Sequence, residues 1–208
     1  MSDPVPQPRR RLGAEERRDQ LVSAAVAVLA AQGYRGATAD AIVQQAGVSK
    51  GLLWHYFADL DDLMVQTARR TVMAIARSIG GRLDLTAPAP VVIRDAIRAA
   101  TRILTEHRAE RRAVQEIIAN LRTPDGSQRL SLADYEDMFA AQEAIFRRGQ
   151  REGDINPSLD PRILAVSYQA AVDGMLDYLE EHPDLDKDRY AADLATILLD
   201  GARSPHPR

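Results

Sequence analysis

Apolar residues recur at intervals of three and four positions along most of the chain, which is the spacing of one face of an α-helix. Beyond residue 58 this spacing predicts helices over residues 59–80, 91–106, 111–121, 131–152, 161–181 and 188–199, with glycine or proline in most of the turns between them. No stretch of the sequence alternates apolar and polar residues over the length of a β-strand, and no segment repeats. The pattern predicts an all-α protein.

Two short helices joined at a glycine are predicted between residues 38 and 57. Thr38 can cap the first helix, because its hydroxyl can accept a hydrogen bond from an unpaired amide of the first turn. The positions expected to point inward are Ala41, Ile42 and either Gln45 or Ala46. Gly47 tolerates the left-handed conformation that ends a helix and turns the chain, and Val48 can anchor that turn in a core.

Ser49 can cap the second helix, in which Leu53 and Phe57 lie four residues apart and are expected to point inward. Lysine on the opposite face supplies charge for phosphate, glycine permits close approach to base edges, and polar aromatic edges can hydrogen-bond to phosphate oxygens. The candidate DNA-binding residues of this unit are Thr38, Ser49, Lys50, Gly51, Leu52, Trp54, His55 and Tyr56. The pattern is that of a helix-turn-helix, although an exposed aromatic face can also pack against another helix or a partner chain.

The segment LVSAAVAVLAAQGYRGATADAIVQQAGVSKGLLWHYFADLDDL, residues 21–63, resembles the N-terminal domain of the TetR family of bacterial transcriptional regulators. The resemblance rests on the alanine-rich first helix ending at residues 32–34, the Thr38 cap, residues 46–49 (AGVS) and residues 56–57 (YF). It implies an all-helical homodimer in which Lys50, Gly51, Trp54, His55 and Tyr56 contact operator DNA.

Three positions depart from that family pattern. Trp54 stands where tyrosine is usual, Leu52 where a small hydroxyl residue is common, and Leu60 where a lysine often reaches phosphate. These departures affect the expected base preference and phosphate contacts. Asp59 and Asp62 form a capping pair for the helix that follows.

Composition narrows the class of protein. The chain has 208 residues, of which 45% are hydrophobic, so it can bury the core of one or two small domains. It contains no cysteine, which excludes disulfides, thiolate metal sites and cysteine nucleophiles. Neither a signal peptide nor a membrane span is expected, and a cytoplasmic protein is predicted. The expected division is a flexible basic arm (1–12), a helix-turn-helix DNA-binding domain (13–59), a helical effector-binding and dimerisation domain (60–202) and a tail (203–208).

The net charge of −3 argues against a protein that coats nucleic acid indiscriminately. Residues 1–60 hold seven lysines and arginines against six acidic residues, so that even this part has a charge of only +1. Three of the basic residues are consecutive: Arg9, Arg10 and Arg11. Such an arm can enter a minor groove or follow phosphates, and a solvated tail is the alternative.

Residues 163–179, ILAVSYQAAVDGMLDYL, are apolar over more than one helical stripe, so this helix must be covered on more than one side. In the TetR family the last two long helices form a four-helix bundle with their copies, and the resemblance therefore implies a homodimer through these helices. The alternative is a central helix in a monomer.

Polar or large residues on otherwise apolar helices are the candidates for a small-molecule effector site: His107, Tyr135, Phe139, Tyr168, Gln169 and Asp173. Each has a structural alternative. His107 can complement a helix dipole, Tyr135 and Phe139 can be core residues, and Tyr168 and Asp173 can belong to a dimer surface.

The four histidines show no metal-ligand spacing and no catalytic motif is present, so neither an enzyme, nor a metal, nor a cofactor is expected. The predicted function is a repressor that a small-molecule effector releases from double-stranded operator DNA. A ligand-independent adaptor of the same fold, acting through a protein partner, is the alternative, and a helical enzyme is a remote one.

Overall fold

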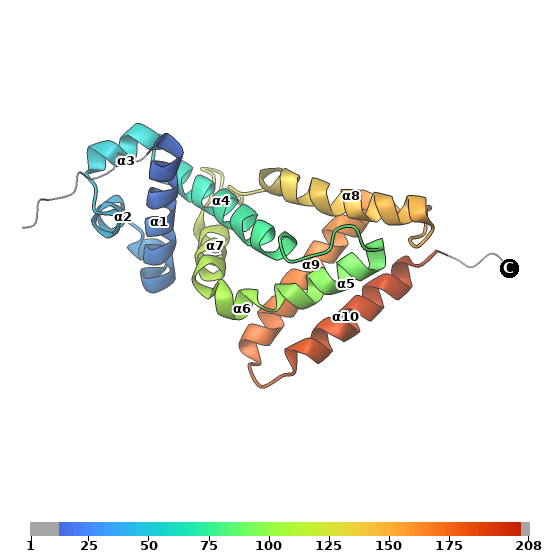
Figure 1. Ribbon diagram of the computed structural model, residues 1–208. Helices are drawn as coiled ribbons and strands as arrows, with labels where there is room; N and C mark the ends of the chain where they lie inside the picture. Colours follow the sequence, from blue (N-terminus) through green and yellow to red (C-terminus); the bar gives the residue numbers. More distant parts are fainter. Residues whose placement is uncertain (1–12, 205–208) are drawn as a thin grey trace, which may run out of the picture.

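The computed structural model describes residues 13–204, and its regular structure there is helical, which confirms the all-α prediction. The elements are α1 (Ala14–Gly36), α2 (Ala39–Ala46), α3 (Lys50–Tyr56), α4 (Leu60–Gly80), α5 (Ala89–Ala100), α6 (Ile103–Glu106), α7 (Arg108–Asn120), the 3₁₀ helix η1 (Leu132–Tyr135), α8 (Glu136–Glu152), α9 (Pro161–Glu181) and α10 (Lys187–Ala202). Helices α1–α3 form one end of the molecule, and α4 leads from them into the larger bundle (Figure 1).

The predicted caps of α2, α3 and α4 and the predicted turn between α2 and α3 are present in the structure. The Thr38 hydroxyl accepts a hydrogen bond from the Ala41 amide at 3.2 Å, and the Ser49 hydroxyl accepts one from the Leu52 amide at 3.2 Å. Gly47 ends α2 in the left-handed conformation, with φ 65° and ψ 37°. Asp59 opens α4 by accepting a hydrogen bond from the Asp62 amide at 2.7 Å. Each short helix therefore begins and ends at a residue suited to that position.

The interior of α2 differs in one respect from the expectation. Ile42 is buried and Ala41 and Ala46 are partly buried against the core, as predicted, and Gln45 is exposed. Val43 is buried in addition. Because α2 packs against both α1 and α3, it presents a wider apolar face than one stripe of three-and-four spacing indicates.

One hydrophobic core, called here the head core, joins α1–α3 to the start of α4 and to α7. Its large buried side chains from the first four helices include Leu21, Leu29, Ile42, Leu53, Phe57, Leu63 and Met64. Three buried residues from α7 and its end, Ala113, Ile117 and Leu121, complete it. The helix-turn-helix thus rests on a helix that follows it by about fifty positions in the chain. The domain boundary at residue 59 stays a prediction, and this core crosses it.

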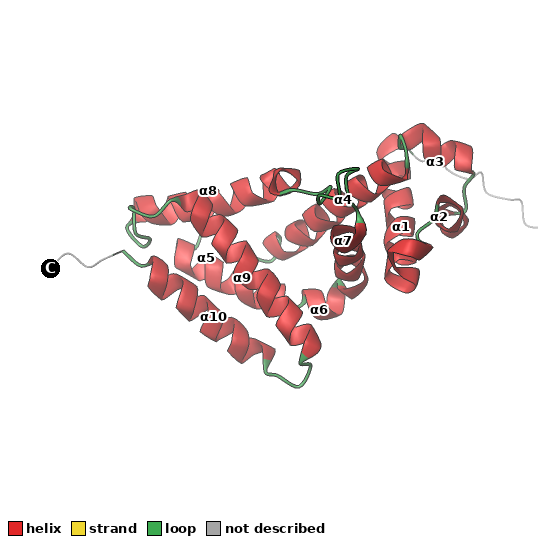
Figure 2. Cartoon of the chain, turned by 180° about the vertical axis from the view of Figure 1, so that it is seen from behind, coloured by secondary structure: helices red, strands yellow, loops and turns green. Residues whose placement is uncertain are grey.

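A second core lies among α5, α6, α8, α9 and α10. Its buried members include Ile97 of α5, Phe146 of α8, Met175 and Leu176 of α9, and Leu199 of α10. Helices α9 and α10 lie next to each other on the face seen in Figure 2. No helix within residues 13–204 is long and apolar enough to cross a membrane.

Two predicted helices are interrupted. The helix expected over residues 91–106 is divided into α5 and α6 at Thr101 and Arg102, whose amides bond to carbonyls only three residues back. The Thr101 hydroxyl also donates to the Arg98 carbonyl at 2.8 Å, and this local bond competes with regular helix bonding. The helix expected over residues 131–152 begins as the 3₁₀ turn η1 and becomes α-helical at Glu136. Apolar spacing does not distinguish these tighter turns from a continuous helix.

Gly149 of α8 lies close against Ala89 of α5 and against Ile155, which follows α8. It is buried, and a methyl group there would lie 2.6 Å from Ile155 Cγ1 and 2.8 Å from Ala89 Cβ. We expect Gly149→Ala to lower the free energy of unfolding by about 1–3 kcal/mol through overpacking, despite the better helix propensity of alanine. Chemical denaturation measures this. Gly80→Ala is the control, because nothing lies within 4 Å of a methyl group there, and equal stability of the two variants would contradict the prediction.

Candidate DNA-binding site

The outer face of α3 is the candidate surface for DNA. Leu53 and Phe57 are buried in the head core and fix the helix, which leaves Lys50, Gly51, Trp54 and His55 exposed. Helix α3 lies at one end of the molecule (Figure 1). The Trp54 side chain is 41% exposed, an unusual setting for the one tryptophan of the chain. A rigid helix therefore presents a cation, a glycine and two polar aromatic rings to the outside.

Tyr56 and Leu52 are less exposed than predicted. Both are partly buried, and Tyr56 packs against the head core. The Arg18 guanidinium of α1 lies 5.4 Å from the centre of the Tyr56 ring, and the His55 ring meets it edge-on at 5.0 Å. The Tyr56 ring is therefore part of the packing between α1 and α3, which the outward position alone did not indicate.

Lys50 forms an ion pair with Asp40 of α2, with 2.7 Å between the ammonium nitrogen and Oδ1. The sequence reasoning did not single out Asp40. An acidic residue in the first turn of a helix is commonplace, because it complements the positive end of the helix dipole. The pairing with Lys50 depends on the angle between the two helices.

An ion-pair network holds α1 against α4. Arg70 of α4 contacts the carboxylates of Glu15 and Asp19, each at 2.8 Å. Hydrogen bonds from Arg70 and then from Arg18 lower the pKa of Glu15. The groups are on the surface, so the network orients the helices and contributes little to stability by itself.

A partly buried contact joins the end of α1 to α7. Gly33 breaks α1 with φ 69°, and the next amide, that of Tyr34, donates a hydrogen bond to Glu116 Oε2 at 2.9 Å. The break would leave this amide without its helical acceptor, and the Glu116 carboxylate supplies one. Sequence reasoning missed Glu116, and a glycine within a helical pattern was the available signal.

The six candidate effector residues fall into two places. Tyr135 and Phe139 lie where α8 begins and Tyr168, Gln169 and Asp173 lie on α9, the helix packed against α8. His107 lies apart, between α6 and α7, with Nε2 3.1 Å from the Ser78 hydroxyl of α4.

A series of hydrogen-bonded side chains, called here the polar chain, connects α8 to α9. The Gln142 amide donates to Gln169 Oε1 at 2.7 Å, and the Gln169 amide donates to Asp173 Oδ1 at 2.9 Å. Asp173 is exposed as a residue, yet burial of its carboxyl group raises its pKa to about 6. Burial likewise raises the pKa of Tyr135 to about 12 and that of Tyr168 well above its usual range. Gln142 was not among the predicted candidates.

Two buried atoms at this polar chain have no hydrogen-bond partner in the part of the protein that the structure describes. They are Tyr135 Oη and Gln142 Oε1. An unpaired buried polar atom costs free energy, and Thr67 Oγ1 and Arg148 Nε are unpaired in the same way elsewhere in the described residues. Phe139 is buried next to them, under the Arg162 guanidinium at 4.8 Å from its ring centre.

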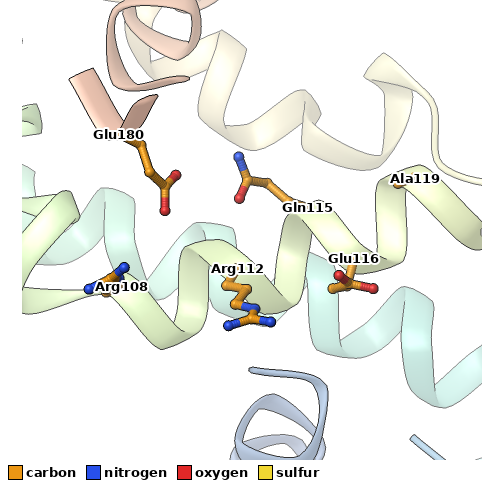
Figure 3. A pocket seen from close by; sticks show the side chains of 6 residues that line it. All are labelled: Arg108, Arg112, Gln115, Glu116, Ala119 and Glu180. Carbon is orange, nitrogen blue, oxygen red and sulfur yellow. The ribbon is translucent and has the colours of Figure 1, made fainter. Parts of the chain in front are cut away.

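A hollow of about 360 Å³ lies elsewhere, along the outer face of α7 (Figure 3). Its lining residues are Arg108, Arg112, Gln115, Glu116, Ala119 and Glu180. None of the six predicted effector residues lines it, and its walls are mostly charged rather than apolar. Small-molecule pockets usually have apolar walls, so this hollow does not replace the predicted site. No group of three or more His, Asp or Glu within residues 13–204 is placed to hold a metal ion.

Arg9, Arg10 and Arg11 lie outside the described residues, so their predicted contact with DNA stays a prediction.

Residues 21–67 match the family described as bacterial regulatory proteins, tetR family. The HTH-type transcriptional regulator HbdR of Aromatoleum sp. (strain CIB) is 37% identical over 75 residues, which are 36% of this chain and 33% of HbdR. BetI of Vibrio vulnificus (strain YJ016) is 38% identical over 68 residues, or 33% of this chain and 34% of BetI. The chain thus spans about a third of the length of the curated relatives it matches.

The likeness in structure extends further. A protein from Shewanella sp. PV-4 assigned to the tetR family of transcription regulators superimposes with a TM-score of 0.72 at 15% identity, over 91% of this chain and 99% of the other. The regulator FadR from Bacillus subtilis, solved with stearoyl-CoA, superimposes with a TM-score of 0.66 at 17% identity, over 89% and 99%. Residues 21–67 of this chain match the TetR family, and over 91% of its length the chain has the fold of a solved regulator assigned to that family. The resemblance inferred from the sequence is confirmed.

Proposed function

We propose that this protein is a sequence-specific DNA-binding repressor that a small molecule releases from its operator. The observation that carries the proposal is the exposed face of α3, which the Thr38, Gly47 and Ser49 caps and the buried Leu53 present at one end of the molecule. Lys50, Thr38 and Ser49 serve phosphate contacts at the start of the two helices. Gly51, Trp54 and His55 face the base edges, where sequence is read.

The DNA-binding form is a homodimer that pairs α9 and α10 of one protomer with their copies. Both helices carry large apolar side chains on their free faces: Ile163 is 65% exposed and Ile197 is 68% exposed. Tyr178, near the end of α9, and Leu185, in the turn before α10, are exposed as well. Large apolar side chains exposed along two neighbouring helices are of the kind that marks an interface between chains. A two-fold dimer presents two α3 helices to two operator half-sites.

The effector site that we propose lies between α8 and α9, at the polar chain formed by Gln142, Gln169 and Asp173. The unpaired Tyr135 Oη and Gln142 Oε1 support this location, because a ligand with hydrogen-bonding groups can satisfy both atoms. Arg111 of α7 pairs with Asp177 and Glu180 of α9, and Glu116 of α7 holds the end of α1. A shift of α9 therefore moves α7, and through α7 it moves α1–α3.

Selection from a random duplex library with the full-length chain is expected to enrich a two-fold symmetric sequence. Lys50→Ala should weaken binding to the enriched duplex roughly tenfold or more, because a hydrogen bond to a charged group contributes about 1.5–3 kcal/mol. Tyr56→Phe keeps the ring packed under Arg18 and removes only the hydroxyl, so it should reduce affinity at an unchanged melting temperature. Fluorescence anisotropy and thermal denaturation measure both. If no sequence is enriched, the proposed function is wrong.

Ile197→Glu should convert the dimer to a monomer, because it places a charge in the apolar surface of α10. Analytical ultracentrifugation measures the mass. Since Ile197 is exposed within one protomer, the variant should remain folded. Leu85→Glu is the matched control: Leu85 is 52% exposed and belongs to the segment between α4 and α5, not to α9 or α10. A wild-type monomer, or a dimer that survives Ile197→Glu, contradicts this interface.

Compounds that raise the melting temperature in a thermal-shift screen are expected to release the enriched duplex. Tyr135→Phe removes a buried hydroxyl that has no partner, so it should preserve or raise stability while abolishing both responses. Compounds that act equally on Tyr135→Phe place the effector site elsewhere. Compounds that stabilise the protein without releasing DNA instead favour an adaptor that works through a protein partner.

A further inference from the structure

The side-chain ammonium group of α3 already forms an ion pair within the protein. Lys50 is the one lysine or arginine in α3, and its ammonium nitrogen lies 2.7 Å from Asp40 Oδ1 and 2.9 Å from Asp40 Oδ2. Lys50 stands at the first position of α3 and Asp40 in the first turn of α2. The pair therefore bridges the beginnings of both helices of the helix-turn-helix, on its outer face.

Both partners are open to solvent, with 51% of the Lys50 side chain and 77% of the Asp40 side chain exposed. An exposed ion pair contributes little to folding. Its effect on DNA binding is larger, because every cation available to phosphate adds to sequence-independent affinity. A carboxylate beside that cation cancels its charge and repels the phosphate backbone.

We propose that Asp40 is a specificity-determining residue, which suppresses binding to arbitrary DNA by tethering Lys50. The inference rests on the proposed DNA-binding function. A free lysine on a flexible stem reaches a phosphate in any register of the head on the duplex. A lysine held by Asp40 reaches a phosphate only where contacts between α3 and the bases of the operator hold the helix-turn-helix in its specific position. Asp40 thereby disfavours the wrong sequences more than the right one.

The competing role for Asp40 is support of α2, as an acidic residue at the positive end of the helix dipole. The two roles differ in what the Asp40→Asn variant changes. Loss of helix support lowers the melting temperature and leaves the salt dependence of DNA binding alone. Release of Lys50 changes the salt dependence, and only if Lys50 is present.

The test compares the full-length wild type with Asp40→Asn, Lys50→Ala and the double variant. The control is Asp184→Asn, which removes one negative charge from the exposed segment between α9 and α10. Two probes are used: the duplex enriched by the wild type, and a mixed-sequence duplex of equal length that lacks the enriched sequence. Dissociation constants are measured by anisotropy between roughly 50 and 200 mM salt.

Asp40→Asn is expected to bind the mixed-sequence duplex roughly three- to tenfold more tightly, with a log–log salt slope steeper by about one unit per subunit. Affinity for the enriched duplex should rise by less, so the ratio of the two affinities falls. In the Lys50→Ala background, Asp40→Asn should leave the slope unchanged.

Equal behaviour of Asp40→Asn and Asp184→Asn, or the same gain with and without Lys50, overturns the proposal. So does a gain that is equal on both duplexes, because specificity is then unaffected. A wild type that enriches no duplex overturns the proposed function and the role of Asp40 with it. An enriched duplex whose discrimination is untouched by Asp40→Asn overturns the role of Asp40 alone.

Discussion

The packing of α7 into the head core is the interaction on which the other features of this structure depend. Ala113, Ile117 and Leu121 close a core that α1–α3 and the start of α4 leave open on one side. Helices as short as α2 and α3 bury too little apolar surface to be stable alone, so the helix-turn-helix needs a platform. Because α7 belongs to the larger bundle, the position of the outer face of α3 is set by that bundle as well as by the sequence of α1–α3.

Polar contacts connect α7 to α1 on one side and to α9 on the other. Glu116 bonds to the backbone where Gly33 breaks α1, and Arg111 pairs with two carboxylates of α9. A closely packed helix with partners on both sides moves as a unit, since packed interiors are not continuously deformable. For the proposed effector this contact path matters only if the ligand binds one arrangement of α8 and α9 better than another.

The proposed DNA-binding surface on α3 holds exposed aromatic side chains and a lysine that is paired with a carboxylate. Trp54 and His55 are exposed on a helix that Leu53 and Phe57 anchor, while the nearby Lys50 is neutralised by Asp40. With a net charge of −3 and few free cations on α3, the chain is poorly suited to hold DNA by charge alone. Base contacts must therefore carry more of the proposed affinity, and discrimination between sequences is the consequence.

From sequence alone, the positions that act locally could be predicted: the Thr38 and Ser49 caps, the left-handed Gly47, the inward Leu53 and Phe57, and the ends of α9. A cap or a turn depends on residues only a few positions away along the chain, so it can be predicted from the sequence alone. The pattern singled out Gln169 and Asp173 but not Gln142, which hydrogen-bonds to Gln169, and the effector role of these residues stays a prediction. The tertiary structure alone decided which distant groups meet. The Tyr34 amide and Glu116 are 82 residues apart, and the Lys50–Asp40 pair requires a particular angle between two helices. Periodicity reports which face of a helix is apolar, whereas the helix that covers that face is chosen by packing between segments far apart in the chain.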